Sequence, residues 1–155
     1  IFKDLRSFKG LNHRHEIFLK KKNISFINDS KATSFEASKF ALSSNKNIFW
    51  IVGGQPKLND RFKLKGLSNN ITKTFVIGKN LKFFKKQLAG KVNFEISRTL
   101  EKAVVSIFKI ITKTPDKKVS ILLSPASASF DQFKNFEERG NFFKKLVKFY
   151  GKKYL

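Results

Sequence analysis

The sequence contains neither cysteine nor methionine. Without cysteine the chain can form no disulfide and no thiolate-based metal or catalytic centre, and such a composition fits a cytoplasmic protein. Because translation starts at methionine, its absence predicts that these 155 residues are a fragment or an excised domain of a longer protein.

Long apolar runs are missing as well. No stretch of the sequence approaches the roughly 20 apolar residues that a membrane-spanning helix needs. The opening residues 1–4 lack the apolar segment and the small-residue cleavage site of a secretory signal. The sequence therefore predicts no association with a membrane.

Acidic residues are scarce, since 11 of them face 33 basic residues and leave a formal net charge of +22. An excess of this size suggests a nucleic-acid partner. Lysine supplies 28 of the basic residues and arginine only 5, and the lysines are spread over every segment. Because arginine is the residue favoured for phosphate and base recognition, we predict no nucleic-acid partner and keep a basic nucleic-acid-binding module as the alternative.

Short apolar runs alternate with segments of helical periodicity, and the length suits one domain. Strands are expected at residues 16–20, 24–28, 48–52, 74–77, 92–96 and 119–123. Helices are expected at residues 34–43, 60–67, 80–88, 99–112 and 137–150. This order predicts an α/β fold with a mainly parallel sheet of about six strands, helices on both faces (Rossmann-like) and an N-terminal antiparallel hairpin.

Finer expectations concern the first part of the chain. Residues 1–12 are expected to form a connector. Thr33 and Glu36 have the spacing of a capping box at the start of the first helix. Phe40, with Ala37 or Ala41, is expected to face the core from that helix.

Three loops follow predicted parallel strands, and such loops meet at one edge of a sheet. Residues 28–33 place a lysine and hydroxyls at a helix N-terminus, which favours an anion. Residues 53–57 contain paired glycines, which allow a ligand to approach the backbone, and end in Lys57. Residues 124–140 offer serine hydroxyls and backbone N–H groups. Together the loops suit a small dicarboxylate, although each alone also fits an ordinary connecting loop.

His13 and His15 flank Arg14. Two histidines without a nearby carboxylate cluster are too few for a metal site, so we predict no metal ligands and expect both rings at the surface. No histidine lies near the hydroxyl-rich loop in the sequence, which argues against a serine hydrolase.

Four segments resemble, in order and spacing, the C-terminal domain of the Mur ligases, in particular the members that add D-glutamate to the peptidoglycan precursor. These segments are residues 8–14, 27–33, 53–57 and 124–140. The combination of NDSKAT with SPA-x-ASFDQF-x-NFE-x-RG carries the resemblance, which extends over nearly the whole chain. The Asp-Asn-Pro-Arg motif of the ligase that adds the next residue is missing.

The resemblance implies a monomeric enzyme in which an N-terminal UDP-binding domain and a central ATPase domain precede this C-terminal domain, residues 1–155. Such an enzyme joins D-glutamate to UDP-N-acetylmuramoyl-L-alanine. ATP phosphorylates the acceptor carboxylate with the help of Mg²⁺, and the amine of D-glutamate attacks the acyl phosphate. Both ATP and Mg²⁺ are bound mainly by the central domain, so the isolated domain is expected to be inactive.

Matching positions imply the roles of individual residues. Catalytic roles fall to Lys31 and His13, and the nucleotide side to Arg14 and Asp29. D-Glutamate is implied to contact Thr33, Lys57, Ser129 and, largely through its backbone, Phe136.

Two positions depart from the family pattern. Asn12 stands where the family usually has proline, and Ser127 where it usually has cysteine. Neither position is implied to take part in catalysis, so the departures concern loop rigidity and packing. Another member of the family, such as a folylpolyglutamate synthetase, is a further alternative that the motifs argue against.

Overall fold

The computed structural model describes residues 10–155. Most of the connector predicted for residues 1–12, and the Phe8 and Lys9 part of the first family segment, lie outside the described residues. The elements are β1 Glu16–Lys21, β2 Ile24–Asn28, α2 Phe35–Ser44, β3 Ile48–Gly53, η1 Ser68–Asn70, β4 Ile71–Ile77, α3 Leu81–Leu88, β5 Phe94–Arg98, α4 Leu100–Ile111, β6 Val119–Leu123 and α5 Phe136–Tyr154.

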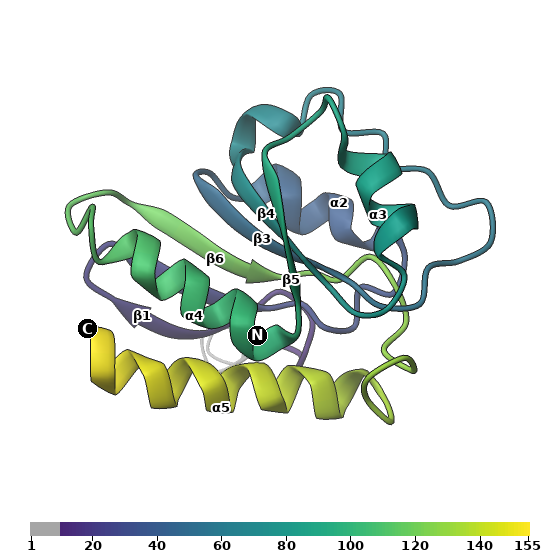
Figure 1. Cartoon of the computed structure of the whole chain (residues 1–155). Helices are drawn as coiled ribbons and strands as arrows, with labels where there is room; N and C mark the ends of the chain where they lie inside the picture. Colours follow the sequence, from purple (N-terminus) through teal and green to yellow (C-terminus); the bar gives the residue numbers. More distant parts are fainter. Residues whose placement is uncertain (1–9) are drawn as a thin grey trace, which may run out of the picture.

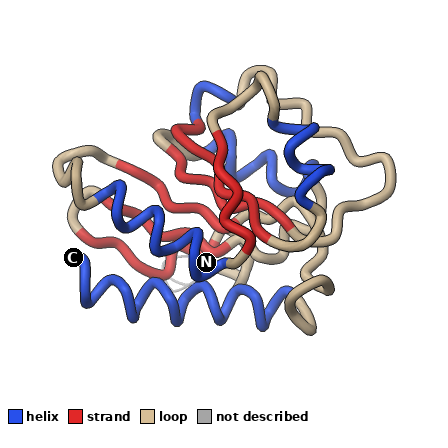
Figure 2. Tube along the Cα trace, in the orientation of Figure 1, coloured by secondary structure: helices blue, strands red, loops and turns tan. Residues whose placement is uncertain are grey.

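One six-stranded sheet runs through the molecule in the order β1-β2-β6-β3-β4-β5 (Figures 1 and 2). Only β1 is antiparallel to its neighbour, and the other strand pairs are parallel. The hairpin turns at Lys22, whose φ of 52° is the left-handed backbone that a two-residue turn demands. The predicted fold class is therefore confirmed, including the N-terminal hairpin.

The two central strands, β3 and β6, are buried on both faces, as the continuous apolar sequence of β3 and the largely apolar one of β6 predict. In β3, Phe49 and Ile51 point into the core under α4 and α5. Trp50 and Val52, between them, point into the core that α2 covers on the opposite face. Alternation of this kind splits the apolar interior into two layers, and α4 and α5 lie together on one side of the sheet in Figure 1.

The helix predicted at residues 60–67 is wrong. This segment is extended up to Leu64 and then turns into η1. Phe62 and Leu64 are buried while the residues beside them are exposed, so its apolar period is two and not 3.6. Phe62 and Leu64 lie two positions apart and would point to opposite sides of a helix, but an extended segment buries both.

The first helix also differs from its prediction at the N-terminus. Ser34, and not Thr33, caps α2, because the Ser34 hydroxyl accepts a hydrogen bond of 3.3 Å from the Ala37 N–H. Phe40 is 65% exposed and does not face the core as predicted, whereas Ala41, one of the two predicted alternatives, is buried together with Phe35. Phe35, Ser38 and Leu42 define the buried face of the helix, and Phe40 lies outside it.

Other boundaries shift without changing the topology. Strand β4 begins three residues earlier than predicted, β5 lies two residues later, and α5 extends to Tyr154. None of the helices among residues 10–155 combines the length and the apolar character needed to cross a bilayer.

Candidate functional site

The three predicted loops leave adjacent strands. Parallel pairing places β6 between β2 and β3, with Leu123 level with both Asn28 and Ile51. The carboxyl ends of these strands therefore lie side by side, and the loops after them meet at one edge of the sheet. This adjacency brings together the segments that carry Thr33, Lys57 and Ser129.

The β6–α5 loop runs along this edge and is tied to the loops beside it. Gln55 and Ala128 exchange two backbone hydrogen bonds of 2.8 and 2.9 Å. Further along, Asp131 accepts a hydrogen bond of 2.9 Å from the Lys79 N–H, and the Gln132 side chain donates to the Arg98 carbonyl at 3.1 Å. The loop is thus held by the ends of β3, β4 and β5.

The paired glycines serve this packing and do not open space for a ligand, contrary to the expectation from the sequence. A Cβ on Gly53 would lie 2.0 Å from the Ile77 carbonyl oxygen, and one on Gly54 would lie 2.2 Å from the Ala128 carbonyl oxygen. The chain's own backbone fills both positions, so these glycines allow the loops to approach each other.

The predicted nucleotide-side residues share one cavity. Arg14, Asp29 and Lys31 line a cavity of about 410 Å³ whose apolar part comes from Ala37 and Phe40. The side chains of Arg14 and Lys31 are exposed, whereas Asp29 is only 8% exposed. Two cations beside an apolar patch suit a ligand with both a phosphate and an apolar group.

Hydrogen bonds fix the carboxylate of Asp29. One oxygen accepts from the His15 N–H at 3.0 Å, and the other accepts from the Ser124 hydroxyl at 2.7 Å. The Ser124 carbonyl in turn accepts from the indole N–H of Trp50 at 2.7 Å. Burial raises the pKa of Asp29, while the hydrogen bonds from Ser124 and His15 act in the opposite direction.

His13 is buried and not at the surface, in contrast to the prediction. Its ring Nδ1 lies 2.9 Å from the side-chain nitrogen of Asn28. The Asn28 side-chain oxygen accepts from the Ser30 N–H, so its nitrogen is the donor and His13 Nδ1 the acceptor. This pairing places the proton of a neutral His13 on Nε2.

The surroundings of His13 favour the neutral ring. Burial lowers the pKa of His13, and the nearby Lys144 ammonium lowers it further. Burial alone would raise the pKa of Glu16, but hydrogen bonds from the His13 N–H and Lys144 lower it overall. The ring also packs edge-on against Phe136 at 5.9 Å. The catalytic role of His13 stays a prediction, and its contacts join β1 and β2 to α5.

Replacing Gly140 with alanine tests this packing. A Cβ there would lie 2.2 Å from His13 Nδ1 and 2.9 Å from the Asn28 side-chain oxygen, both buried. We expect Gly140→Ala to lower the free energy of unfolding by about 2 kcal/mol. The matched control is Gly151→Ala in the same helix, which meets nothing within 4 Å and should raise stability by about 0.5–1 kcal/mol. Urea denaturation measures both, and equal effects would contradict the packing.

Lys31 and Phe136 contact each other. The Lys31 ammonium lies 5.4 Å from the centre of the Phe136 ring, and the Phe136 carbonyl accepts from the Ser30 hydroxyl at 2.8 Å. Phe136 is the first residue of α5, and its N–H has no partner within residues 10–155. A free N–H at a helix N-terminus can donate to an anion.

The hydroxyls predicted to bind D-glutamate differ in burial. Ser129 is 2% exposed and Thr33 is half-buried, and neither hydroxyl has a hydrogen-bond partner among the described residues. Lys57 is exposed on the loop after β3. The N-terminus of α2 is partly occupied, because Asp60 accepts from the Phe35 N–H at 3.1 Å.

Arg139 is the organising residue that the sequence did not reveal. Its guanidinium is 1% exposed and donates to the Ser30 hydroxyl at 2.9 Å, the Ser30 carbonyl at 2.8 Å and the Ser127 carbonyl at 3.0 Å. Burial lowers the pKa of Arg139 to about 10, which leaves it charged at neutral pH. Arg139 is the arginine of the NFE-x-RG motif, but arginine side chains are rarely this buried. Its role in holding the loops together could therefore not be predicted from the sequence.

Binding of a metal ion would need a group of histidine or carboxylate side chains. Within residues 10–155 no three histidine, aspartate or glutamate side chains gather in a group that could hold one. The candidate site therefore consists of cations, hydroxyls and backbone N–H groups, a set suited to carboxylates and phosphates.

Comparisons with known proteins bear on the whole chain. A UDP-N-acetylmuramoylalanine--D-glutamate ligase of Nitrobacter hamburgensis is 47% identical over 145 residues, which cover 94% of this chain and 31% of the relative. A ligase of the same name from Nitrobacter winogradskyi is 46% identical, with 93% and 31% covered. One from the Wolbachia of Brugia malayi is 44% identical, with 92% and 28% covered. No protein-family model matches the chain.

The chain thus spans only about three tenths of the length of the curated relatives it matches. Partial coverage of this kind is consistent with the C-terminal domain that the four sequence segments resemble. The ligase name of these relatives also supports that domain over a nucleic-acid-binding module or a folylpolyglutamate synthetase. The chain belongs to the Mur ligase family, in which it matches one part of a UDP-N-acetylmuramoylalanine--D-glutamate ligase.

Proposed function

We propose that the chain is the D-glutamate-binding, C-terminal domain of an ATP-dependent ligase that joins D-glutamate to UDP-N-acetylmuramoyl-L-alanine. In this proposal the parent protein is a cytoplasmic monomer that also contains the UDP-binding and central ATPase domains. The main support is the 47% identity to a ligase of that name over 94% of the chain. The grouping of the three loops at one sheet edge agrees with it.

The D-glutamate half of the proposal rests on the chemistry of the loop residues. D-Glutamate carries two carboxylates, and its amine must stay free to attack. The Lys57 ammonium, the Thr33 and Ser129 hydroxyls and the Phe136 N–H are donors, so they can hold carboxylates and leave the amine unbound. Orienting the amine in this way lowers the entropic cost of the reaction.

The nucleotide half rests on the cavity beside Asp29. In the proposed enzyme the central domain binds most of the ATP and the Mg²⁺, and this cavity contributes the remaining contacts to the nucleotide. ATP supplies the phosphoryl group that activates the acceptor carboxylate. Arg14 and Lys31 line the cavity and would face negatively charged groups of the nucleotide. Asp29 has both oxygens fixed by hydrogen bonds and would accept from a ligand hydroxyl or amino group. Lys31 also lies beside Phe136, which connects the two halves.

The single domain supplies only part of such a site. The cavity is bordered by the exposed side chains of Arg14 and Lys31 and is therefore open to solvent. Electrostatic stabilisation of a transition state needs a site from which water is excluded. We therefore propose that activity requires closure against the central domain, and that the isolated domain is inactive.

Substitutions in the full-length parent ligase test the D-glutamate site. We expect Lys57→Ala to raise the KM for D-glutamate by about 10- to 100-fold and Ser129→Ala by about 5- to 10-fold, since a charged and a neutral hydrogen bond are lost. Phosphate release that depends on ATP and D-glutamate provides the measurement.

The control is Lys117→Ala, which removes an exposed lysine from the turn between α4 and β6. Its KM should stay within about twofold of the wild-type value. Unchanged KM values for both Lys57→Ala and Ser129→Ala would refute the D-glutamate assignment. Activity with L-glutamate or another amino acid in place of D-glutamate would refute the proposed substrate.

A further inference from the structure

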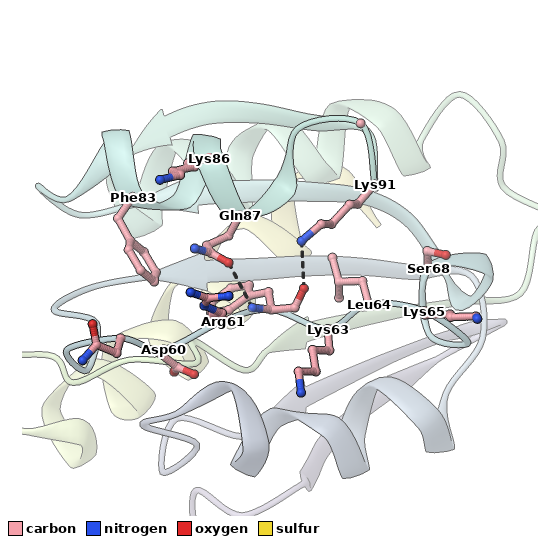
Figure 3. A pocket seen from close by; sticks show the side chains of 13 residues that line it. Asp60, Arg61, Lys63, Leu64, Lys65, Ser68, Phe83, Lys86, Gln87 and Lys91 are labelled. Atoms are coloured by element: carbon pink, nitrogen blue, oxygen red, sulfur yellow. Dashed lines mark hydrogen bonds between the residues drawn. The ribbon is translucent and has the colours of Figure 1, made fainter.

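A large cavity in the described part of the chain lies outside the candidate site. It is a groove of about 1180 Å³ between α3 and residues 59–65, which include the extended segment around Phe62 (Figure 3). None of the predicted site residues lines it. The groove therefore needs an explanation of its own.

The floor of the groove is rigid. Phe62 is 1% exposed and stacks on Phe35 with ring centres 4.7 Å apart. Its N–H donates to the Gln87 side-chain oxygen at 3.0 Å, and its carbonyl accepts from the Lys91 ammonium at 3.0 Å, as the dashed lines in Figure 3 mark. These bonds fix the extended segment against α3, so the groove is formed without a ligand.

The walls carry an excess of positive charge. Five cationic side chains border the groove, and its only acidic side chain is Asp60, which is bound to the Phe35 N–H. The cations are Arg61, Lys63, Lys65, Lys86 and Lys91. None of them belongs to a salt bridge within residues 10–155.

This excess is not a general property of the surface cavities. The cavity at the start of α5 has two lysines and two glutamates, and so no net charge. The nucleotide-side cavity pairs Arg14 and Lys31 with Asp29. Among these three cavities, positive charge is concentrated in the groove beside α3.

We infer that this groove is a binding site for a compact polyanion of the polyphosphate class. Arg61 and Lys86 come from facing walls and border Phe83 at one end of the groove in Figure 3. Arginine presents a planar fork of donors to phosphate oxygens, and lysine adds a point charge. A polyphosphate chain carries several charges in a small volume, which matches the net charge of the walls.

Titration calorimetry of the 155-residue chain with inorganic tripolyphosphate tests the inference. We expect one saturable site per chain, with an affinity that decreases as salt is added. Arg61→Gln combined with Lys86→Gln should weaken binding about tenfold, because two charged contacts are lost. Both side chains are exposed, so the fold should be unaffected.

Two variants with the same loss of charge serve as controls. Lys117→Gln with Lys118→Gln removes two exposed lysines from a distant turn, and Lys109→Gln with Lys113→Gln removes two exposed lysines from the C-terminal end of α4 and the turn after it. The affinity of both control variants for tripolyphosphate should stay within about twofold of the wild-type affinity, apart from the general effect of net charge. A tenfold loss in either control, or no saturable site in the wild type, would overturn the inference. Tighter binding of a tetraglutamate peptide than of tripolyphosphate would overturn the phosphate class.

This site is independent of the proposed ligase function. Its failure would leave the D-glutamate assignment untouched, since Lys57 and Ser129 do not line the groove. Conversely, unchanged D-glutamate KM values in Lys57→Ala and Ser129→Ala would leave the groove assignment standing.

Discussion

Replacing Arg139 with alanine is expected to lower the free energy of unfolding by about 3 kcal/mol. The guanidinium donates three hydrogen bonds to Ser30 and Ser127, and no carboxylate forms a salt bridge with it among the described residues. Its removal leaves two buried carbonyls without a donor and opens a cavity beneath the loops. Each unsatisfied group costs about 1–3 kcal/mol, partly offset because the charge itself is expensive to bury.

Further variants at the same position separate these effects. Arg139→Met fills most of the volume but donates no hydrogen bond. The difference in the free energy of unfolding between Arg139→Met and Arg139→Ala therefore measures the cost of the cavity alone. Arg139→Lys keeps the charge but not the planar fork, and we expect an intermediate loss. Urea denaturation with a constant m-value provides the measurement.

The control for Arg139 is Arg61→Ala, which removes an exposed arginine and should change stability by less than about 0.5 kcal/mol. A loss of that small size in Arg139→Ala would contradict the role assigned to the buried guanidinium. The position of Arg139 also predicts a functional effect, because Ser30 and Ser127 belong to the loops that carry Lys31 and Ser129.

Prediction from the sequence worked best where one pattern decides the structure. Strand β6 has the predicted bounds, and β3 differs by one residue, because short runs that are wholly apolar, as in β3, or apolar except for Ser120, as in β6, fit a doubly buried strand. The extent of α4 agrees with its spacing of apolar residues, and Thr99 caps it. The prediction for residues 60–67 failed because the segment has only three apolar residues, too few to distinguish a period of two from one of 3.6.

The position of the candidate site in the fold could be predicted from the sequence, but the contacts that hold its residues in place could not. That Lys31, Lys57 and Ser129 follow strand ends can be read from the order of strands. The contacts that fix them join residues far apart in the sequence, such as Ser30 with Arg139 and Gln55 with Ala128. Burial of His13 has the same origin, since Asn28 and α5 enclose it. Sequence periodicity carries no information on such pairs.

The backbone bridge between Gln55 and Ala128 at the sheet edge leads to the second large effect on stability. We expect Gly54→Ala to lower the free energy of unfolding by about 3–4 kcal/mol, the sum of backbone strain and overpacking. Gly54 has a φ of +139°, which L residues rarely adopt, and the new Cβ would lie 2.2 Å from the Ala128 carbonyl oxygen. That oxygen accepts from the Gln55 N–H at 2.8 Å, so it cannot move without breaking the bridge between the two loops.

Gly66→Ala isolates the steric part of this effect. Gly66 also has a positive φ, of +80°, but a Cβ there meets nothing within 4 Å. Strain alone should therefore cost about 1–2 kcal/mol in Gly66→Ala. The difference between the two variants in urea denaturation measures the contact between the β3 and β6 loops. Equal losses would mean that the Ala128 backbone moves aside, and the edge that carries Lys57 and Ser129 would then be less firmly held than the hydrogen bonds imply.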